Sequence, residues 1–533
     1  MSISAEAAQS FVSKYEGLVA PKEKAVGEAW WRLATTGSDD ARKNMVEAGK
    51  AYNEVFSDAS DFAEISRFHE ERDALEPILR RQVEVLHRTF AGSQGEKETL
   101  ENIEELEAKA NSVYSNHRGV VGGEEVGENR VRSILRSSDD EALRREAWEA
   151  SKTVGREVEP TVRELARLRN EVAREQGYEN HYFRSLALQE IEAEELEGIM
   201  SGLKEATDEP FRELKDSLDS ELKEKFGAES VMPWHLFDPF FQEPPETDGL
   251  DTNKYYAGGD LESLTVKTYD NLGLDVRGVL RNSDLYERGG KDQHAFCLHV
   301  GRDFPYDVRV LANLRPGNPD SYWANTMLHE FGHAVYDRHI DPSLPFFLRT
   351  VAHTNSTEAI ALMMDGLTED PGWLKNVARV PEEDIDEERL AARRRADGLV
   401  FVRWAMVMYR FEQILYENPD REDLNDVWWD LVEEIQFVNR PPERDEPDWA
   451  AKIHVAVAPV YYHNYVIGEL IAAQLRHYME SSITHGPFYL SESAGRFLLE
   501  SFFGPGARDD WRDTVERATG EKLNPKHFAA SLV

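Results

Sequence analysis

The sequence predicts a mostly helical fold that contains one small β-sheet. Up to about residue 230, apolar residues recur at spacings of three and four, while Gly and Pro are few. Leu196, Ile199, Met200 and Leu203 form a typical run. Because this spacing places apolar side chains on one face of an α-helix, we expect the amino-terminal part of the chain to be a series of helices.

Two segments further along the chain predict the sheet. His294–Val300 has strand character, and in Tyr306–Asn313 apolar residues alternate with polar or opposite-facing ones. After a turn rich in Pro, Gly and Asn, Tyr322–His339 returns to helical spacing, as does most of the remaining chain. The aromatic-rich stretch Pro233–Gly259 predicts an ordered loop that packs on the core.

The charge of the chain excludes one class of function. The 533 residues include 101 Asp and Glu against 62 Lys and Arg, which gives a formal charge of −39 at pH 7. Nucleic-acid-binding proteins gain affinity by neutralising phosphates with cations, so nucleic acid is excluded as a partner. Arg outnumbers Lys by 43 to 19. This balance indicates a halophilic protein of a salt-rich cytoplasm, and an ordinary acidic protein is the alternative.

Cysteine content and hydropathy predict the compartment. The single cysteine, Cys297, cannot form an intramolecular disulfide. The segment Met1–Ala20 lacks the basic and apolar regions of a signal peptide, and no run is apolar enough to cross a bilayer. We therefore expect a cytoplasmic protein that does not insert into membranes.

The organisation of the chain predicts a single body. Neither a linker nor an internal repeat nor a low-complexity segment interrupts it. We expect residues 1–533 to form one unit of two interleaved helical lobes. Within this unit, residues 1–120 are expected to form a helical lid, and residues 290–480 the core that carries the functional site.

The segment His329-Glu330-Phe331-Gly332-His333 is the strongest chemical signal. Residues four apart lie on one face of a helix, so both imidazoles can bind one zinc ion. Glu330 then lies beside the metal, where it can hold a water molecule. The pattern therefore predicts a zinc-dependent hydrolase.

Two residues compete for the place of the third zinc ligand. His339 follows the second histidine by six residues, but Tyr336 stands where such a motif needs a Gly to turn the chain. If the helix continues, His339 lies about 120° from the correct side. Glu358 lies among apolar residues, and Ser356 or Thr357 can begin a helix that carries it. We therefore predict Glu358 as the third ligand, with a fourth position open for water.

Hydrolysis also needs hydrogen-bond donors that stabilise an oxyanion. Lys452, His454, Tyr462 and Tyr465 place polar groups within an otherwise apolar stretch. The two tyrosines are three residues apart and are therefore neighbours on a helical face. The pattern indicates the lining of a site, although tyrosines hydrogen-bonded within a core would give the same pattern.

With these residues, the chain resembles the angiotensin-converting-enzyme-like peptidyl-dipeptidases, zinc peptidases that use a glutamate as third ligand. The similarity is clearest from His294 to the carboxyl end. Asp445–His454 resembles the segment that leads to the family's substrate-binding Lys and His, and His294-Ala295 resembles its edge strand. The resemblance implies a helical ellipsoid with a deep central channel, a small β-sheet beside the zinc helix, and amino-terminal helices that exclude folded proteins.

The resemblance also implies a role for each predicted site residue. His329, His333 and Glu358 would hold zinc. Glu330 would be the general base and would then carry the proton to the leaving amine. The oxyanion donors would be Tyr465 and, assisting it, His454. The residues implied to bind substrate are Lys452 and Tyr462, for the C-terminal carboxylate of the peptide, and His294 and Ala295, for its backbone.

The sequence departs from the family pattern at four places. The family has tyrosines seven and ten residues after the histidine that corresponds to His454, and the thimet-oligopeptidase group has nine and twelve, whereas here they follow by eight and eleven. Asn464 replaces an Arg that binds an activating chloride. Leu362 replaces an Asp that orients a zinc histidine. His235 ends Met232–His235, where the family has a Gln on the substrate carboxylate.

Several functions fit these residues. We predict a zinc metallopeptidase that releases C-terminal dipeptides from short unstructured peptides. His329–Asp337, together with Asp307-Val308-Arg309, also resembles the Taq-type metallocarboxypeptidases, and the tyrosine spacing leaves a thimet-like endo-oligopeptidase as an alternative. A noncatalytic peptide-binding scaffold on a peptidase fold is the alternative from another class.

Overall fold

Helices account for most of the chain in the computed structural model, which describes residues 4–245 and 249–532. The prediction of a mostly α fold is confirmed. Residues 1–3, 246–248 and 533, which the predicted single unit includes, lie outside the described residues. Three of them, 246–248, also belong to the predicted loop Pro233–Gly259.

The described residues divide into two units, each built from separate stretches of the sequence. The first unit comprises the described residues up to Gln94 together with Asp251–Leu390 and Ile467–His527. The second unit comprises Gly95–Leu250, Ala391–Val466 and the described residues from Phe528 onwards. The chain passes from one unit to the other between Gln94 and Gly95, between Leu250 and Asp251, and within three helices. These helices are α16 (Glu387–Glu417), α19 (His463–Tyr478) and α22 (Lys526–Ser531).

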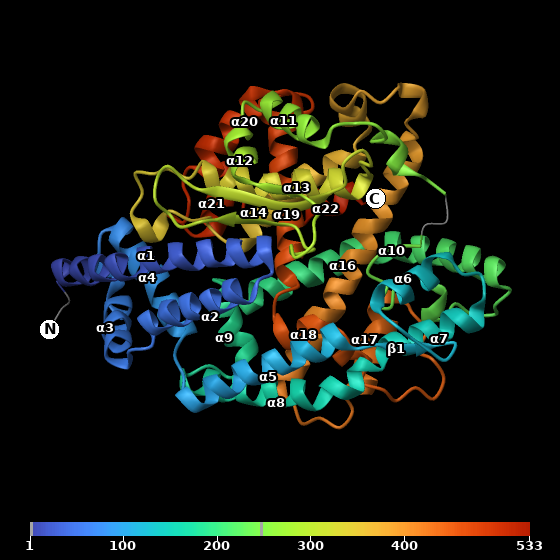
Figure 1. Cartoon of the computed structure of the whole chain (residues 1–533), viewed down its shortest axis with the longest axis horizontal. Helices are drawn as coiled ribbons and strands as arrows, with labels where there is room; N and C mark the ends of the chain where they lie inside the picture. Colours follow the sequence, from blue (N-terminus) through green and yellow to red (C-terminus); the bar gives the residue numbers. More distant parts are fainter. Residues whose placement is uncertain (1–3, 246–248, 533) are drawn as a thin grey trace. The chain divides into compact units, whose positions relative to one another are not determined.

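The first unit contains amino-terminal helices, a sheet and the helices that pack on the sheet (Figure 1). Aromatic side chains of α1, α3 and α4 form a core cluster, in which Tyr15 stacks on Phe11 and meets Phe90 edge to face. The elements of this unit are α1 (Ala5–Thr36), α2 (Asp39–Asn53), α3 (Ala59–Glu70), α4 (Pro77–Gly92), α11 (Leu261–Asn271), α12 (Arg277–Asn282), β3 (Asp284–Tyr286), β4 (Phe296–His299), β5 (Val308–Leu314), α13 (Ser321–Arg338), α14 (Thr354–Asp365), α15 (Pro371–Trp373), α20 (Glu492–Phe497) and α21 (Trp511–Thr519).

The three-stranded sheet has the order β3-β5-β4. The predicted strands correspond to β4 and β5, and β4 pairs antiparallel with β5, with Phe296 opposite Leu311 and His299 opposite Val308. β3 pairs parallel to the other side of β5. The sequence did not reveal β3 because three residues are too few to show alternation. Both β4 and β5 contact α13, so the sheet supports the helix that carries the histidine motif.

The second unit is helical apart from a short hairpin of β1 and β2. Its longest element, α10, follows the apolar spacing that the sequence predicted, with Leu196, Ile199, Met200 and Leu203 all buried. The elements are α5 (Lys97–Asn116), β1 (Gly119–Val121), β2 (Glu124–Val126), α6 (Glu128–Ser137), α7 (Glu141–Lys152), α8 (Val154–Glu175), α9 (His181–Leu188), α10 (Ala193–Phe226), α17 (Leu424–Leu431) and α18 (Ile453–Val457).

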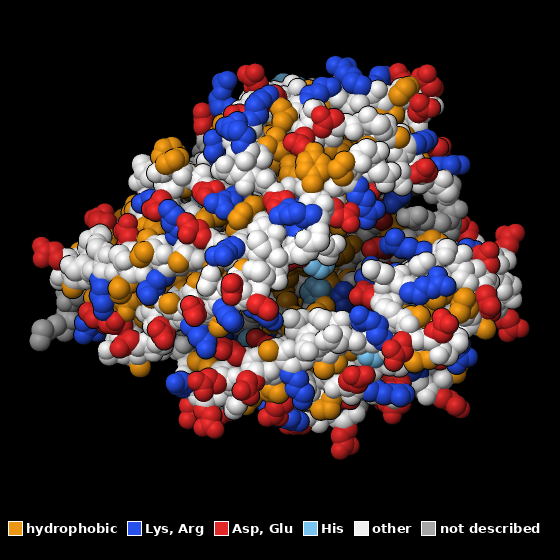
Figure 2. Space-filling model, in the orientation of Figure 1, with side chains coloured by type: hydrophobic (Ala, Val, Ile, Leu, Met, Phe, Trp, Pro, Cys, Tyr) orange, Lys and Arg blue, Asp and Glu red, His pale blue; other side chains and the backbone are white. Residues whose placement is uncertain are grey.

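Acidic and basic side chains are mixed on the face of the molecule that Figure 2 shows. Figure 2 shows Asp and Glu side chains spread over the visible face, with Lys and Arg among them. Within the described ranges, none of the helices combines the length and the apolar composition that crossing a bilayer requires.

The aromatic-rich loop after α10 is held by a buried arginine of α7. Arg144 is fully buried, and its guanidinium donates to the carbonyl oxygens of Trp234, His235 and Leu236 at 2.8, 2.9 and 3.0 Å. A buried carbonyl without a donor is costly. Arg144 therefore fixes the path of this loop, and the described part of the loop is ordered as predicted.

Replacing this guanidinium tests its structural role. We expect Arg144→Leu to lower the free energy of unfolding by roughly 3 kcal/mol, because several buried carbonyls lose their donor together. The neighbouring Arg145, with 59% of its side chain exposed in an ion pair with Glu149, provides the control, and Arg145→Leu should cost less than about 1 kcal/mol. Denaturant unfolding followed by circular dichroism measures the free energy of unfolding of both variants. Equal losses of stability would contradict the role of Arg144 in fixing the loop.

Candidate active site

The histidine motif lies in the middle of α13. This helix begins after Asp320, whose carboxylate accepts a hydrogen bond from the Trp323 N–H and so caps its first turn. Its apolar side chains, among them Phe331, are buried. The rings of His329 and His333 have centroids 4.9 Å apart, because residues four apart share a helical face.

The third predicted ligand, Glu358, lies in α14 and reaches both rings. Its Oε2 atom is 3.8 Å from Nε2 of His329 and 4.0 Å from Nε2 of His333. A tetrahedral zinc ion with bonds of about 2.0–2.1 Å places its ligand atoms about 3.3 Å apart. The donor set of two imidazoles and a carboxylate therefore has the chemistry for zinc and needs only a small contraction to hold it.

A close approach of α13 and α14 produces this convergence. A Cβ atom on Gly332 would lie 2.8 Å from the Cα atom of Ala361. Real Cβ atoms do not come this close to a backbone atom, so the helices can cross here only with glycine at this position. α14 begins at Thr354, capped by His353, which is two or three residues earlier than the predicted start at Ser356 or Thr357.

Each predicted zinc histidine is oriented by a hydrogen bond from its other ring nitrogen. His329 Nδ1 lies 2.8 Å from Asp365 Oδ2, and His333 Nδ1 lies 2.8 Å from Thr357 Oγ1. Both Nε2 atoms are thereby left for a metal. The sequence analysis missed Asp365, which follows Glu358 by seven residues, or two helical turns, and so lies on the same face of α14.

Glu330 is buried beside the predicted ligands, with 8% of its surface exposed. Burial raises the pKa of Glu330 to about 7; the positive charge of His329 and the backbone N–H of Cys297 lower it, and the charge of Glu358 raises it further. A cavity of about 370 Å³ opens over this carboxyl. Its lining includes the three predicted ligands, Glu330 and the β4 side of the sheet.

The structure places the other first-unit residues as follows. Ala295, next to β4, lines the same cavity, whereas His294 is not among its lining residues. His339 is directed back to its own helix, where Nδ1 lies 2.7 Å from the carbonyl oxygen of Val335. That geometry accords with the exclusion of His339 as a ligand.

The remaining predicted residues belong to the second unit and gather around α18. The rings of His454 and Tyr462 have centroids 5.0 Å apart, and those of Tyr462 and Tyr465 are 5.7 Å apart. Lys452 Nζ lies 5.8 Å from the centre of the Tyr462 ring. Burial lowers the pKa of His454 to about 4, so its imidazole is neutral at pH 7. The structure thus brings these four residues together; their role in a site stays a prediction.

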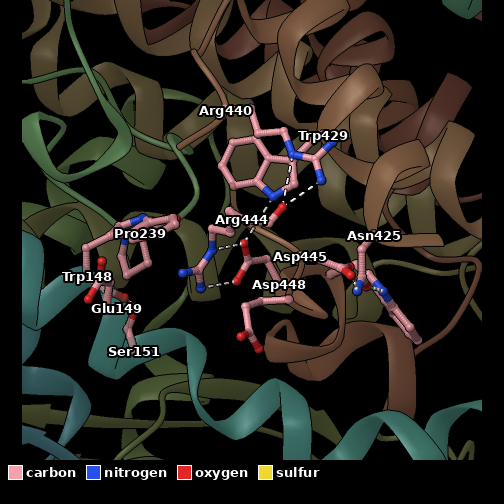
Figure 3. A network of polar contacts seen from close by, with 12 residues as sticks. Trp148, Glu149, Ser151, Pro239, Asn425, Trp429, Arg440, Arg444, Asp445 and Asp448 are labelled. Carbon is pink, nitrogen blue, oxygen red and sulfur yellow. Dashed lines mark hydrogen bonds and ion pairs between the residues drawn. The ribbon is translucent and has the colours of Figure 1, made fainter. Parts of the chain in front are cut away.

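A buried ion pair fixes the chain just before Lys452. Arg444 donates two hydrogen bonds of 2.6 Å to Asp448, whose carboxylate also accepts from the indole of Trp429 at 3.1 Å (Figure 3). Asp448 is 1% exposed, so removing either partner would leave an uncompensated buried charge. The network therefore holds the short 3₁₀ helix Asp448–Ala451, which leads directly into Lys452.

Gln242 is a hydrogen-bond partner of Lys452 that the sequence analysis did not find. Its Oε1 accepts a hydrogen bond of 2.5 Å from Lys452 Nζ, and its Nε2 donates to Asp238. Burial lowers the pKa of Lys452 to about 8. His235, where the family pattern has its Gln, is fully buried against Glu141 instead. No local signal marks Gln242, because only the folded loop brings it to Lys452.

Comparison with known proteins identifies the family. A family model described as angiotensin-converting enzyme, a peptidase family, matches residues 2–236 and 292–528. The chain belongs to this family. It is also similar to Carboxypeptidase 1 of Bacillus subtilis, with 23% identity over 341 residues. That match covers 59% of this chain and 63% of the relative, less than two thirds of its length. The resemblance stated from the sequence is confirmed.

The crossing of α13 and α14 yields a prediction about stability. We expect Gly332→Ala to lower the free energy of unfolding by about 1–3 kcal/mol, because the added methyl group forces two helix backbones apart. In Gly17→Ala, the control, the new methyl group meets nothing within 4 Å on α1 and should stabilise by about 0.5–1 kcal/mol. Thermal unfolding of both variants measures the difference, and a neutral Gly332→Ala would refute the close crossing.

Proposed function

We propose that this protein is a zinc metallopeptidase that acts on short unstructured peptides and releases dipeptides from their C-termini. The observation that carries the proposal is the convergence of His329, His333 and Glu358, whose ligand atoms lie within 4.8 Å of one another. Membership of a peptidase family supports it. When bound, zinc would supply a Lewis acid that polarises the scissile carbonyl and acidifies a water molecule.

The roles proposed for the chain's own residues are those that the resemblance to the family implies. Glu330 Oε takes the proton of the attacking water and delivers it to the leaving amine. Tyr465 Oη donates to the oxyanion, and His454 assists it. The ammonium of Lys452 and the hydroxyl of Tyr462 bind the free carboxylate of the peptide, and Gln242 orients the ammonium.

The backbone of the substrate is assigned to the edge of the sheet. β4 is an edge strand of the sheet, and Ala295 next to it lines the cavity over Glu330. An extended peptide can add to such an edge through main-chain hydrogen bonds. We assign this contact to Ala295 and His294. A lid formed by residues 1–120, a cytoplasmic location and adaptation to salt stay predictions.

A carboxypeptidase is the second candidate, because the Bacillus relative bears that name. Incubation of the protein with free-ended and end-blocked peptides distinguishes these candidate functions. Dipeptides released only from free C-termini support the proposal, and single amino acids support a carboxypeptidase. Internal cuts in end-blocked peptides support an endo-oligopeptidase. Tight binding without cleavage supports a scaffold and would overturn the proposed activity.

The role of Glu330 can be tested separately from metal binding. We expect Glu330→Gln to lower kcat by about 10²–10⁴-fold, because the amide cannot accept the proton of water. The zinc content measured by elemental analysis should stay at that of the unchanged protein. Glu500→Gln, at an exposed carboxylate, is the control and should leave kcat unchanged. A fully active Glu330→Gln enzyme would rule out Glu330 as the base.

The hydrogen bond from Asp365 predicts an effect on metal affinity. We expect Asp365→Asn to weaken zinc binding by about 10–100-fold, because the ring of His329 loses its charged acceptor. Competition with a chromogenic chelator measures the affinity. Glu382→Gln, which removes a largely exposed carboxylate paired with Lys375, should leave the affinity unchanged. Equal affinities for the Asp365 variant and the unchanged protein would contradict the assignment.

A further inference from the structure

A strained residue lies in the turn that leads into Tyr462 and Tyr465. Val460 has φ of 55°, in the left-handed region, and is 2% exposed. A β-branched side chain rarely adopts this conformation, which costs on the order of 1–3 kcal/mol and persists only where surrounding contacts enforce it. The turn between α18 and α19 is therefore held in place by groups outside it.

The N–H of Val460 is held by a carboxyl group of α16. Glu412 Oε1 accepts a hydrogen bond from this N–H at 2.9 Å. Glu412 is 2% exposed, and burial raises its pKa to about 8, while the Val460 N–H and the charge of Arg169 lower it. Both the neutral and the ionised carboxyl offer an acceptor oxygen, so the contact survives either state.

The carbonyl of Val460 is held by an amide at the end of α9. Gln189 Nε2 donates to Val460 O at 3.1 Å. The oxygen of the same amide accepts from Asn464 Nδ2 at 2.7 Å and lies 3.2 Å from His463 Nε2. One side chain thus binds both the strained turn and the first turn of α19, which begins at His463.

We infer that Gln189 and Glu412 are positioning residues that hold Tyr465 in its reactive orientation through the turn at Val460. The inference rests on the proposed role of Tyr465 as oxyanion donor. Without the two contacts, Val460 would relax toward negative φ, which would reorient the residues that follow. An oxyanion donor displaced by about 1 Å costs roughly 10²-fold in rate. Because an oxyanion exists only after attack, this loss falls on kcat rather than on KM.

The test is a double-mutant cycle between Gln189 and Tyr465. We expect Gln189→Leu to lower kcat by about 10–100-fold, with KM changed less than about threefold and zinc content unchanged. In the Tyr465→Phe background, Gln189→Leu should cost less than about twofold more, because the group that it positions is already gone. Equal losses in both backgrounds, or an unchanged kcat for Gln189→Leu, would overturn the inference.

A second pair of variants keeps the test valid if Gln189→Leu does not fold. Glu412→Gln retains an acceptor for the Val460 N–H and should keep kcat within about threefold, whereas Glu412→Leu removes the acceptor and should lower kcat by about 10–100-fold. If Glu412→Gln is as impaired as Glu412→Leu, the acceptor role is refuted.

A matched control separates positioning from stability. Gln474 is more deeply buried than Gln189, and it donates to Thr519 and to the backbone near the carboxyl end. Gln474→Leu should lower Tm as much as Gln189→Leu does while leaving kcat unchanged. Loss of kcat in both would reduce Gln189 to a structural role and overturn the inference. If Tyr465→Phe alone leaves kcat unchanged, the proposed oxyanion role fails instead, and the inference falls with it.

Discussion

The crossing of α13 and α14 is the constraint on which the predicted metal centre depends. A hydrogen atom at Gly332 lets the backbone of α13 approach Ala361, and Glu358 thereby comes within 4.0 Å of both motif histidines. The same approach brings the carboxylate of Asp365 to Nδ1 of His329. Ligand and supporting acid lie two turns apart on one face of α14, so a single packing geometry places both.

In the second unit, polar side chains that bind buried groups fix the loops in the same way. Arg144 binds successive carbonyls of the aromatic-rich loop, Arg444 is paired with Asp448, and Gln189 binds the turn at Val460. The buried carbonyls and the buried carboxylate of Asp448 that these groups bind would be costly to leave without a partner. Loops that carry no regular hydrogen bonding of their own are thus given one conformation, and the chain around Lys452 and Tyr465 is held in place.

The accuracy of the sequence predictions followed the range of the interactions involved. The strands β4 and β5 were predicted because alternation is local, and β3 was missed because it is held mainly by pairing with β5. Asp365 follows Glu358 by seven residues, a spacing that places both on one face of a helix. The sequence analysis looked for this acid only four residues after Glu358, where Leu362 stands, and so missed it. Gln242 carried none, because it lies 210 residues before Lys452.

The sequence alone determined the helical class, the histidine pair with its glutamate, and the resemblance to the family, since all of these depend on spacings within a turn or two of helix or on short motifs. The tertiary structure decided which acid supports His329, which amide meets Lys452, and why Val460 holds a left-handed conformation. Those contacts join residues far apart in the chain. These contacts form because a polar group removed from water needs a hydrogen-bond partner. Only the packing of the folded chain determines which partner is within reach.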